Sequence, residues 1–151
     1  MLLFDSFERM VKLFNYTTTP KEAKSGFMLK IVLASRSPRR KKLLQQLGLI
    51  FEIFPSKAEE IPSTNAPNEV VVELAHQKAV EVAHHSPGAL VIGADTIVVL
   101  AGKILSKPEH PQHAIEMLQA LSGRTHTVYT GVSFVKTSND GKITEKHSFY
   151  E

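Results

Sequence analysis

The sequence predicts an α/β fold in which helices cover a sheet. The run Ala89–Leu100 is apolar almost throughout, which is typical of a strand that helices bury on both faces. Short apolar runs also alternate with segments of helical spacing, which favours strand–helix–strand units. With 151 residues, of which 42% are hydrophobic and 22% charged, the chain can form one domain with a substantial core.

Residues 1–27 are predicted to form an extension ahead of this domain. Apolar residues recur there at helical spacing, which predicts a short amphipathic helix containing Leu3, Phe7, Met10, Val11 and Phe14. A polar linker over 17–26 follows, and Met28 stands directly before the first predicted strand. Acidic residues occur in the extension, and no small-residue cleavage site follows an apolar stretch, so a targeting peptide is not indicated.

The first strand–helix junction has an unusual charge pattern. After a buried strand over Ile31–Ala34, Ser37 is placed as a helix N-cap, and Gly48 ends the helix. The first turn carries Arg39-Arg40-Lys41-Lys42, although a helix N-terminus has a partial positive charge and favours acidic residues. A bound anion such as a phosphate would make sense of these cations. A solvated basic helix end would explain the same residues.

A second strand is predicted over Leu49–Phe54, followed by a polar loop over 56–67 that carries Glu60. A helix then runs from about 68 to 85, and Lys78 lies in line with its apolar positions. The side chain of such a lysine either snorkels to the surface, which is the more common arrangement, or points into a site where an anion meets it.

Asp95 interrupts the apolar core strand. A buried ionised carboxylate needs a cation, a metal ion or several hydrogen-bond donors, because isolated burial costs much free energy. Backbone N–H groups at a strand end could meet the same need. Gly93, two residues earlier, indicates a bulge or the close approach of another backbone or a ligand.

The last part of the chain predicts one more helix between strands. A tight turn at 101–102 leads into a short strand over 103–105, and a hairpin turn at 138–141 joins a long strand over 124–135 to a returning strand that reaches Tyr150. A helix is predicted between Pro111 and Leu121, with an apolar face of Ala114, Ile115, Leu118 and Leu121.

The composition excludes several kinds of site. The sequence has no cysteine, hence no disulfide, thiolate metal site or cysteine nucleophile, which fits a cytoplasmic protein. No apolar run is long enough to span a membrane, and neither a P-loop nor a G-x-G-x-x-G motif occurs. His110 and His113 have no third ligand at a recognised spacing, so surface histidines are predicted. The net charge of +3 suits polyanions in general.

Together these signals predict a metal-dependent phosphate site. Its candidate members are Ser35, Arg39 and Arg40 at the helix start, the carboxylates Glu60 and Asp95, and the cations Lys78 and Lys107. Hard divalent ions commonly bind through one or two carboxylates plus substrate phosphates. Such an ion offsets charge on a phosphoryl group, while a carboxylate orients or deprotonates a water.

The chain resembles the Maf family. The resemblance rests on four motifs in the family's order, which are Leu33-Ala-Ser-Arg-Ser-Pro-Arg-Arg40, Ile92-Gly-Ala-Asp-Thr96, Ser106-Lys-Pro108 and Leu121-Ser-Gly-Arg-Thr-His-Thr-Val-Tyr-Thr-Gly-Val132. Glu60 and Lys78 also match positions of the family pattern. The match covers about 28–151, and the resemblance implies that the family domain continues past this end, so that its C-terminal part is missing here.

That resemblance implies an inosine-triphosphatase-like mixed sheet flanked by helices, with a cleft between two lobes. It implies a nucleoside triphosphate pyrophosphatase that cuts between the α- and β-phosphates, with Mg²⁺ or alternatively Mn²⁺ or Co²⁺. The phosphates would be held by Ser35, Arg39, Arg40, Lys78 and Lys107. Glu60 and Asp95 would be metal ligands, with Asp95 also the base for the attacking water. Family members often pair as homodimers.

The resemblance extends to one branch of the family. Ser-Pro-Arg-Arg together with Gly-Ala-Asp-Thr is similar to the branch that acts on dTTP and UTP. The branch that acts on 7-methyl-GTP has Trp after Ser-Pro and Ser-Asp-Gln at the second motif. Arg39 and Thr96 therefore favour a pyrimidine substrate.

Two other functions compete with this prediction. A non-catalytic, partner-binding role would fit the association of the family name with septum formation and inhibition of cell division, and it would use the amphipathic N-terminal segment. Nucleic-acid binding through 36–42 is less favoured, because no aromatic residues interleave with the basic run to stack on bases. No membrane association is predicted.

Overall fold

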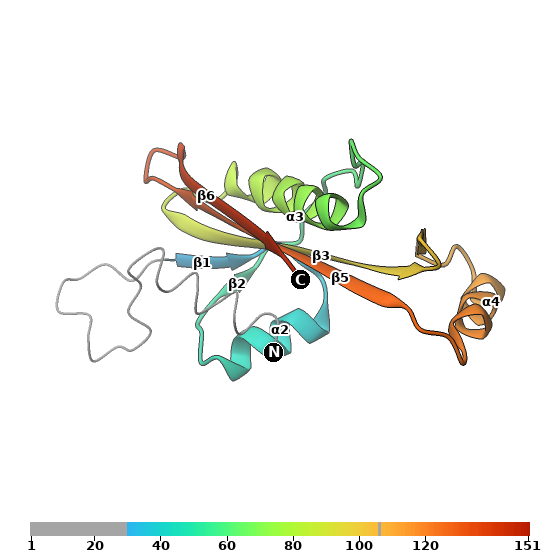
Figure 1. The fold of residues 1–151 in the computed structure, drawn as a ribbon. Coiled ribbons are helices and arrows are strands. Elements are labelled where there is room, and N and C mark those ends of the chain that lie inside the picture. Colours follow the sequence, from blue (N-terminus) through green and yellow to red (C-terminus); the bar gives the residue numbers. More distant parts are fainter. Residues whose placement is uncertain (1–29, 106) are drawn as a thin grey trace.

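The computed structural model describes residues 30–105 and 107–151 (Figure 1). The predicted N-terminal helix, the linker and Met28 lie outside these residues. In chain order the elements are β1 (Lys30–Leu33), α2 (Pro38–Gln46), β2 (Glu52–Ile53), α3 (Pro67–Ala83), β3 (Ala89–Leu100), β4 (Lys103–Leu105), α4 (Pro111–Leu121), β5 (Thr127–Thr137) and β6 (Ile143–Tyr150). None of the helices in the described ranges is both long and apolar enough to cross a membrane.

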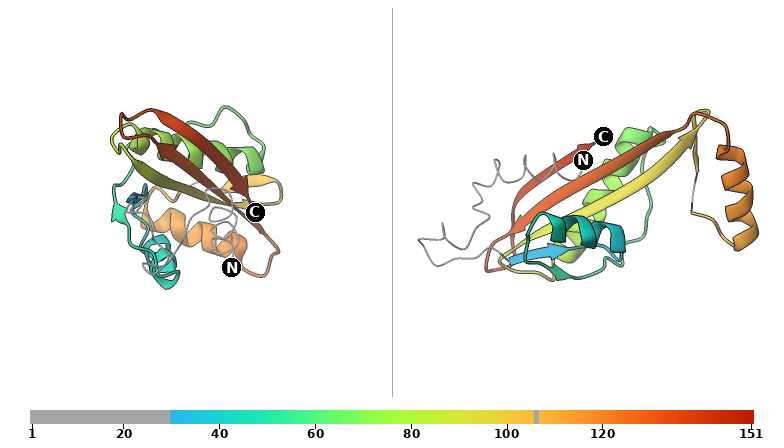
Figure 2. Two further views of the ribbon diagram at one scale, coloured as in Figure 1. Left: turned by 90° about the vertical axis from the view of Figure 1, so that its left-hand side faces the viewer. Right: turned by 90° about the horizontal axis from the view of Figure 1, so that it is seen from below.

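The strands form one mixed sheet in the order β2-β1-β3-β5-β6, with β4 paired to β3. β1 runs parallel to both β2 and β3, whereas the pairs β3–β4, β3–β5 and β5–β6 are antiparallel. The β3–β5 ladder is the longest and reaches from Leu90 paired with Lys136 to Val99 paired with Thr127. β1 ends at Leu33, whereas β3 and β5 are longer and continue past its end toward α4 (Figure 2).

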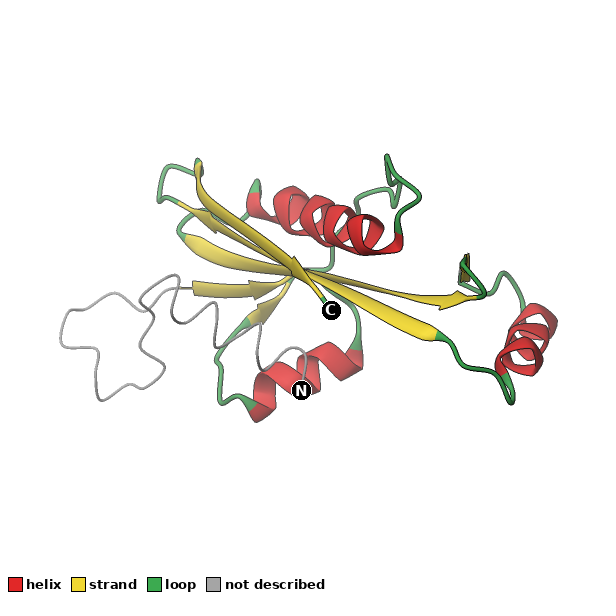
Figure 3. Ribbon diagram, viewed as in Figure 1, coloured by secondary structure: helices red, strands yellow, loops and turns green. Residues whose placement is uncertain are grey.

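Helices α2 and α3 cover opposite faces of this sheet (Figure 3). Successive residues of a strand point to opposite faces, so one strand feeds both layers of the core. The α2 side holds Ile31, Leu33, Leu44, Leu90, Ile92, Ala94, Val132 and Phe134, and the α3 side holds Val32, Ala34, Ala79, Val82, Ala83, Ala89, Val91 and Val135. The predicted α/β sheet flanked by helices is confirmed, while the cleft between two lobes stays a prediction.

Two glycines allow α3 to lie directly on the sheet. A Cβ atom at Gly93 would lie 2.2 Å from the backbone oxygen of Ala75, and one at Gly131 would lie 2.1 Å from that of Val71. Gly93 belongs to β3 and Gly131 to β5, so the helix backbone rests on two neighbouring strands. The expectation of a close backbone approach at Gly93 is confirmed.

The second strand is much shorter than predicted. The sequence pattern predicts a strand over Leu49–Phe54, but only Glu52 and Ile53 pair with β1. β2 lies at the sheet edge, and its one neighbour, β1, is only four residues long. The other apolar residues of the predicted strand therefore have no strand to pair with. Leu49 and Phe51 pack against the core under α2 instead.

Helix α4 forms at its predicted bounds, but its apolar face is not buried. Leu118 is 67% exposed and Ile115 is 48% exposed. The helix lies beyond the ends of β3 and β5, apart from α2 and α3 (Figures 1 and 2). Helical spacing therefore predicted the element correctly, whereas the partner of its apolar face does not lie among the described residues.

Candidate active site

The junction between β1 and α2 holds an arginine in a fixed position. The hydroxyl of Ser37 accepts a hydrogen bond from the backbone N–H of Arg40 at 3.5 Å, which caps α2 as predicted. The hydroxyl of the buried Ser35 accepts hydrogen bonds from the Ser37 backbone N–H at 3.2 Å and from Nη1 of Arg40 at 3.0 Å. Nη2 of Arg40 donates to Oγ1 of Thr96 at 3.3 Å. Arg40 thus links the helix start to β3.

A chain of alternating charges lies on the other side of β3. Nζ of Lys78 lies 2.5 Å from Oδ1 of Asp95 and 3.0 Å from Oε1 of Glu60. Nζ of Lys107 donates to both oxygens of Glu60 at 2.8 Å. The Lys78 side chain is only 12% exposed, whereas that of Lys107 is 79% exposed. Lys78 therefore does not snorkel to the surface but points into the site, where it is the cation that the buried Asp95 requires.

The sheet topology explains why the Arg40 network and the Lys78–carboxylate network lie at the same part of β3. The segment after β1 leads to α2 on one face of the sheet, while the segment after β2 leads to α3 on the other face. Neighbouring parallel strands whose connections leave to opposite faces create a crevice at their carboxyl ends. Asp95 and Thr96, adjacent in β3, point to opposite faces of the sheet. Asp95 therefore contacts Lys78 on the α3 side, and Thr96 contacts Arg40 on the α2 side.

The charges of the site shift two pKa values. Partial burial acts to raise the pKa of Glu60, but hydrogen bonds from Lys107 and Lys78 outweigh it, and the pKa of Glu60 lies below its usual value. Burial lowers the pKa of Arg40, which the charge of Asp95 opposes in part. An arginine remains protonated in proteins, so Arg40 is a permanent cation.

Glu60 and Asp95 form a donor set that fits a divalent ion. Both carboxylates converge on a single ammonium group, which shows that a cation can lie between them. Hard divalent ions accept such a pair when substrate phosphates supply further oxygens. Within 30–105 and 107–151 no cluster of three or more His, Cys, Asp and Glu gathers, so these two carboxylates are the candidate ligands in the described part of the chain.

The structure brings most of the predicted residues together. Arg39 lies exposed on the first turn of α2, where its charge contributes to lowering the pKa of Arg40. One member was missed by the residue-by-residue analysis: Oγ1 of Thr130 lies 3.1 Å from Oγ1 of Thr96. Thr130 lies inside the Leu121–Val132 motif, which was the only signal that pointed to it, and the pairing of Thr96 with Thr130 across β3 and β5 supplies the contact.

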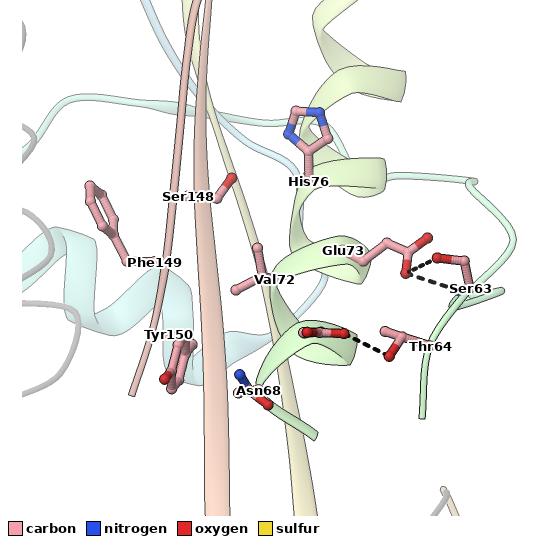
Figure 4. Close-up of a pocket in the computed structure, with 10 residues that line it drawn as sticks. Ser63, Thr64, Asn68, Val72, Glu73, His76, Ser148, Phe149 and Tyr150 are labelled. Atoms are coloured by element: carbon pink, nitrogen blue, oxygen red, sulfur yellow. Dashed lines mark hydrogen bonds between the residues drawn. The ribbon is translucent and has the colours of Figure 1, made fainter. Parts of the chain in front are cut away.

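A separate cavity of about 640 Å³ lies beside α3, next to β6 (Figure 4). None of the predicted site residues lines it; its lining is Ser63, Thr64, Asn68, Glu69, Val72, Glu73, His76, Ser148, Phe149 and Tyr150. Two of these lining residues contact the buried Ser133: its hydroxyl lies 3.2 Å from Nδ1 of His76 and receives a hydrogen bond from Ser148 at 2.9 Å. Burial and the charge of Lys146 lower the pKa of His76, so its ring is neutral at pH 7.

The fold and the site define an α/β protein with a basic helix start beside a pair of carboxylates. The Maf-like protein family model matches residues 30–150, and the chain belongs to this family. It is 47% identical over 137 residues to the dTTP/UTP pyrophosphatase of Agathobacter rectalis, which covers 82% of this chain and 66% of that protein. It is 50% identical over 112 residues to the dTTP/UTP pyrophosphatase of Thermoanaerobacter sp., covering 74% of this chain and 59% of that protein. The chain thus spans about three fifths to two thirds of the length of these curated relatives.

Among solved structures, the HAM1 protein from Coxiella burnetii matches 82% of this chain and 72% of its own chain, with a TM-score of 0.49 and 24% sequence identity.

Proposed function

We propose that the protein hydrolyses nucleoside triphosphates at the α–β phosphoanhydride, with dTTP and UTP preferred, and releases a nucleoside monophosphate and pyrophosphate. One observation carries this proposal: two networks meet at neighbouring residues of β3. Arg40 is hydrogen-bonded to Ser35 and Thr96, and the adjacent Asp95 is ion-paired through Lys78 to Glu60. The family and the names of its relatives support the same activity.

The proposed roles follow from the charge of each group. The first N–H groups of α2, the Ser35 hydroxyl and the guanidinium groups of Arg39 and Arg40 bind the triphosphate, because anions are stabilised at helix N-termini and by arginine forks. Lys78 and Lys107 neutralise phosphate charge as flexible point charges. Arg40 approaches the site already held by two hydroxyl oxygens, which reduces the entropy lost on binding.

Glu60 and Asp95 would hold a divalent ion, Mg²⁺ or alternatively Mn²⁺ or Co²⁺, which supplies electrostatic stabilisation of a phosphoryl group. Asp95 is the proposed base that orients and deprotonates the attacking water, as a carboxylate can when it lies within hydrogen-bond reach of that water. Its position next to Thr96 places it one residue from the group that contacts Arg40. The proton of the water therefore passes to a carboxylate beside the phosphate-binding arginine.

Arg39 and Thr96 are proposed to contribute to the pyrimidine preference, as in the branch that the two motifs resemble. Thr96 contacts Arg40, while Arg39 is exposed beside it on α2. The proposed substrates are metabolites of the cytoplasm, which is therefore the expected location. A homodimer stays a prediction from the family resemblance.

Pyrophosphate release from dTTP, UTP, CTP, GTP and 7-methyl-GTP, with Mg²⁺ and with a chelator, tests the activity directly. We expect release from dTTP and UTP that requires the metal and that is lost in the Asp95→Asn variant. Circular dichroism of both proteins checks that they are folded. A folded protein that releases no pyrophosphate from any of the five nucleotides in Mg²⁺ would contradict the proposal.

Removal of the Thr130 hydroxyl is expected to weaken nucleotide binding. Thr130→Val keeps the shape of the side chain but removes the partner of Thr96, so the group that receives Arg40 is less well oriented. Because a neutral hydrogen bond contributes about 1 kcal/mol, we expect KM for dTTP to rise about fivefold with little change in kcat. Thr130→Ser should restore KM. An equal loss of kcat in both variants would show that Thr130 has a purely structural role.

A further inference from the structure

The ammonium group of Lys78 lies where a metal ion held by Glu60 and Asp95 would also lie. Its Nζ is within 3.0 Å of Oε1 of Glu60 and 2.5 Å of Oδ1 of Asp95. The Lys78 side chain is 12% exposed and that of Asp95 8%, so water screens this contact only weakly. The two carboxylates assigned to the ion are thus already bridged by a cation that belongs to the chain.

An ammonium group and a divalent ion cannot both occupy the position between the two carboxylates. A lysine ammonium directs its N–H groups at carboxylate oxygens, and a divalent ion coordinates those same oxygens. Lys78 sits between both carboxylates, whereas Lys107, within the described part of the chain, pairs with Glu60 alone and is mostly exposed. Lys78 is therefore the residue that competes with a divalent ion for the pair.

A bound triphosphate offers Lys78 another partner close by. Thr96, the residue after Asp95, receives the Arg40 hydrogen bond. Although Asp95 and Thr96 face opposite sides of the sheet, the charges of Asp95 and Glu60 act on Arg40, so phosphates bound at Arg40 lie within electrostatic reach of these carboxylates and of Lys78. The lysine side chain is a point charge on a flexible four-carbon stem and can turn from a carboxylate to a phosphate without movement of α3. This turn removes the ammonium group from Asp95 and leaves Glu60 paired with the exposed Lys107.

We propose that Lys78 is a built-in competitor of the divalent ion, which holds the Glu60–Asp95 pair until a triphosphate draws its ammonium group away. The inference rests on the proposed function, because the triphosphate is the proposed substrate. It makes metal and nucleotide binding mutually dependent: each ligand raises the affinity for the other by the same factor. The protein then binds the ion weakly unless nucleotide is present.

Binding of Mn²⁺ alone, measured from the electron paramagnetic resonance signal of the free ion, tests the inference without turnover. Lys78→Met keeps the unbranched side chain as far as Cε and removes the charged ammonium group. We expect Mn²⁺ to bind this variant between about 5-fold and 150-fold more tightly than the unmodified protein, the usual range of a coupling between two ligands. Equal or weaker binding would overturn the inference. Lys78→Gln serves the same comparison if Lys78→Met does not fold.

Three controls separate this effect from a general loss of positive charge. Lys142→Met removes a charge from the exposed turn between β5 and β6, where Lys142 pairs with Asp140, and should leave Mn²⁺ affinity unchanged. Lys107→Met should give a smaller increase than Lys78→Met, because Lys107 is exposed and bridges no second carboxylate. Glu60→Gln should abolish the tight binding in the Lys78→Met background. Equal increases for all three lysines would overturn the inference.

A second measurement uses the unmodified protein and UTP with a methylene group between its α- and β-phosphates. This analogue should raise Mn²⁺ affinity by a larger factor in the unmodified protein than in Lys78→Met, once Mn²⁺ bound by free analogue is titrated separately, because in the variant the phosphate oxygens add ligands but no ammonium group is drawn away. No increase in the unmodified protein would overturn the inference. A shifted Mn²⁺ affinity in Lys78→Met, together with no pyrophosphate release by the unmodified protein, would overturn the proposed hydrolysis alone. Release by the unmodified protein with an unshifted Mn²⁺ affinity in Lys78→Met would overturn the inference alone.

Discussion

Asp95→Asn is expected to lower pyrophosphate release from dTTP by about 1,000-fold, within the range measured when a general base is removed. The asparagine keeps the shape of the side chain but cannot accept a proton from water. It also removes one of the two carboxylates that would hold the divalent ion, and neutral amide oxygen is a weaker ligand for a hard cation. The loss should therefore appear in kcat/KM at saturating Mg²⁺ and should not be recovered by more metal.

The same change should also reduce stability. Asp95 is buried and receives the short hydrogen bond from Lys78, whose charge then keeps only Glu60 as a partner. Leaving a buried charged group with poorer partners costs about 1–3 kcal/mol, so the free energy of unfolding in urea should fall by that amount. Unfolding must be measured together with activity, so that kcat/KM of the variant is compared under conditions in which the variant is folded.

Asp140→Asn is the matched control for this variant. Asp140 is the partner of Lys142 on the exposed turn between β5 and β6. The chemical change is identical but lies outside the site, so kcat/KM should stay the same. If Asp95→Asn retained turnover within tenfold of the unmodified protein, Asp95 would not be the base, and the assignment of the attacking water to it would be wrong.

Gly93→Ala is expected to lower the free energy of unfolding by about 3 kcal/mol, at the upper end of the usual cost of overpacking a core. The new Cβ atom would lie 2.2 Å from the backbone oxygen of Ala75 and 2.8 Å from the backbone nitrogen of Ala79. Backbone atoms of a helix cannot turn aside as a side chain can, so α3 must move away from the sheet. Lys78 lies on that helix, and we expect the variant to lose activity along with stability.

The clash at Gly93 can be separated from the loss of a glycine as such. Gly123→Ala places its Cβ where no atom lies within 4 Å, and its positive φ of 69° should cost about 1 kcal/mol. Urea unfolding of the two variants gives the comparison, and dTTP hydrolysis should survive only in Gly123→Ala. Equal losses of stability would mean that α3 is not seated on Gly93.

Much of the fold could be predicted because its signals are local. The bounds of β3, β4 and α4 agree with the apolar runs and the helix start and stop residues. The N-cap at Ser37 and the glycine at 48 define α2 within one turn of chain. The second strand failed as a prediction because β1 offers a partner for only two of its residues, which no pattern within the strand itself can reveal.

The candidate site could be predicted as a set of residues but not as a set of contacts. A buried Asp95 must have a partner, and cations at the start of α2 are unfavourable unless an anion binds there. The sequence left open whether Lys78 reached the surface, and snorkelling was the more common outcome. Only the close seating of α3 on Gly93 and Gly131 brings Lys78 to Asp95, because contacts between residues far apart in the chain depend on packing.

The sequence by itself determined the α/β class, the position of most elements, the cluster of cations at the start of α2 and the family to which the chain belongs. Those properties depend on residue type and on neighbours a few positions away. The tertiary structure decided that Thr130 supports Thr96, that Lys78 bridges two carboxylates, and that the apolar face of α4 is exposed. These contacts depend on which strands pair and on how closely a helix approaches them. Strand pairing and helix packing are fixed only when the whole sheet has formed.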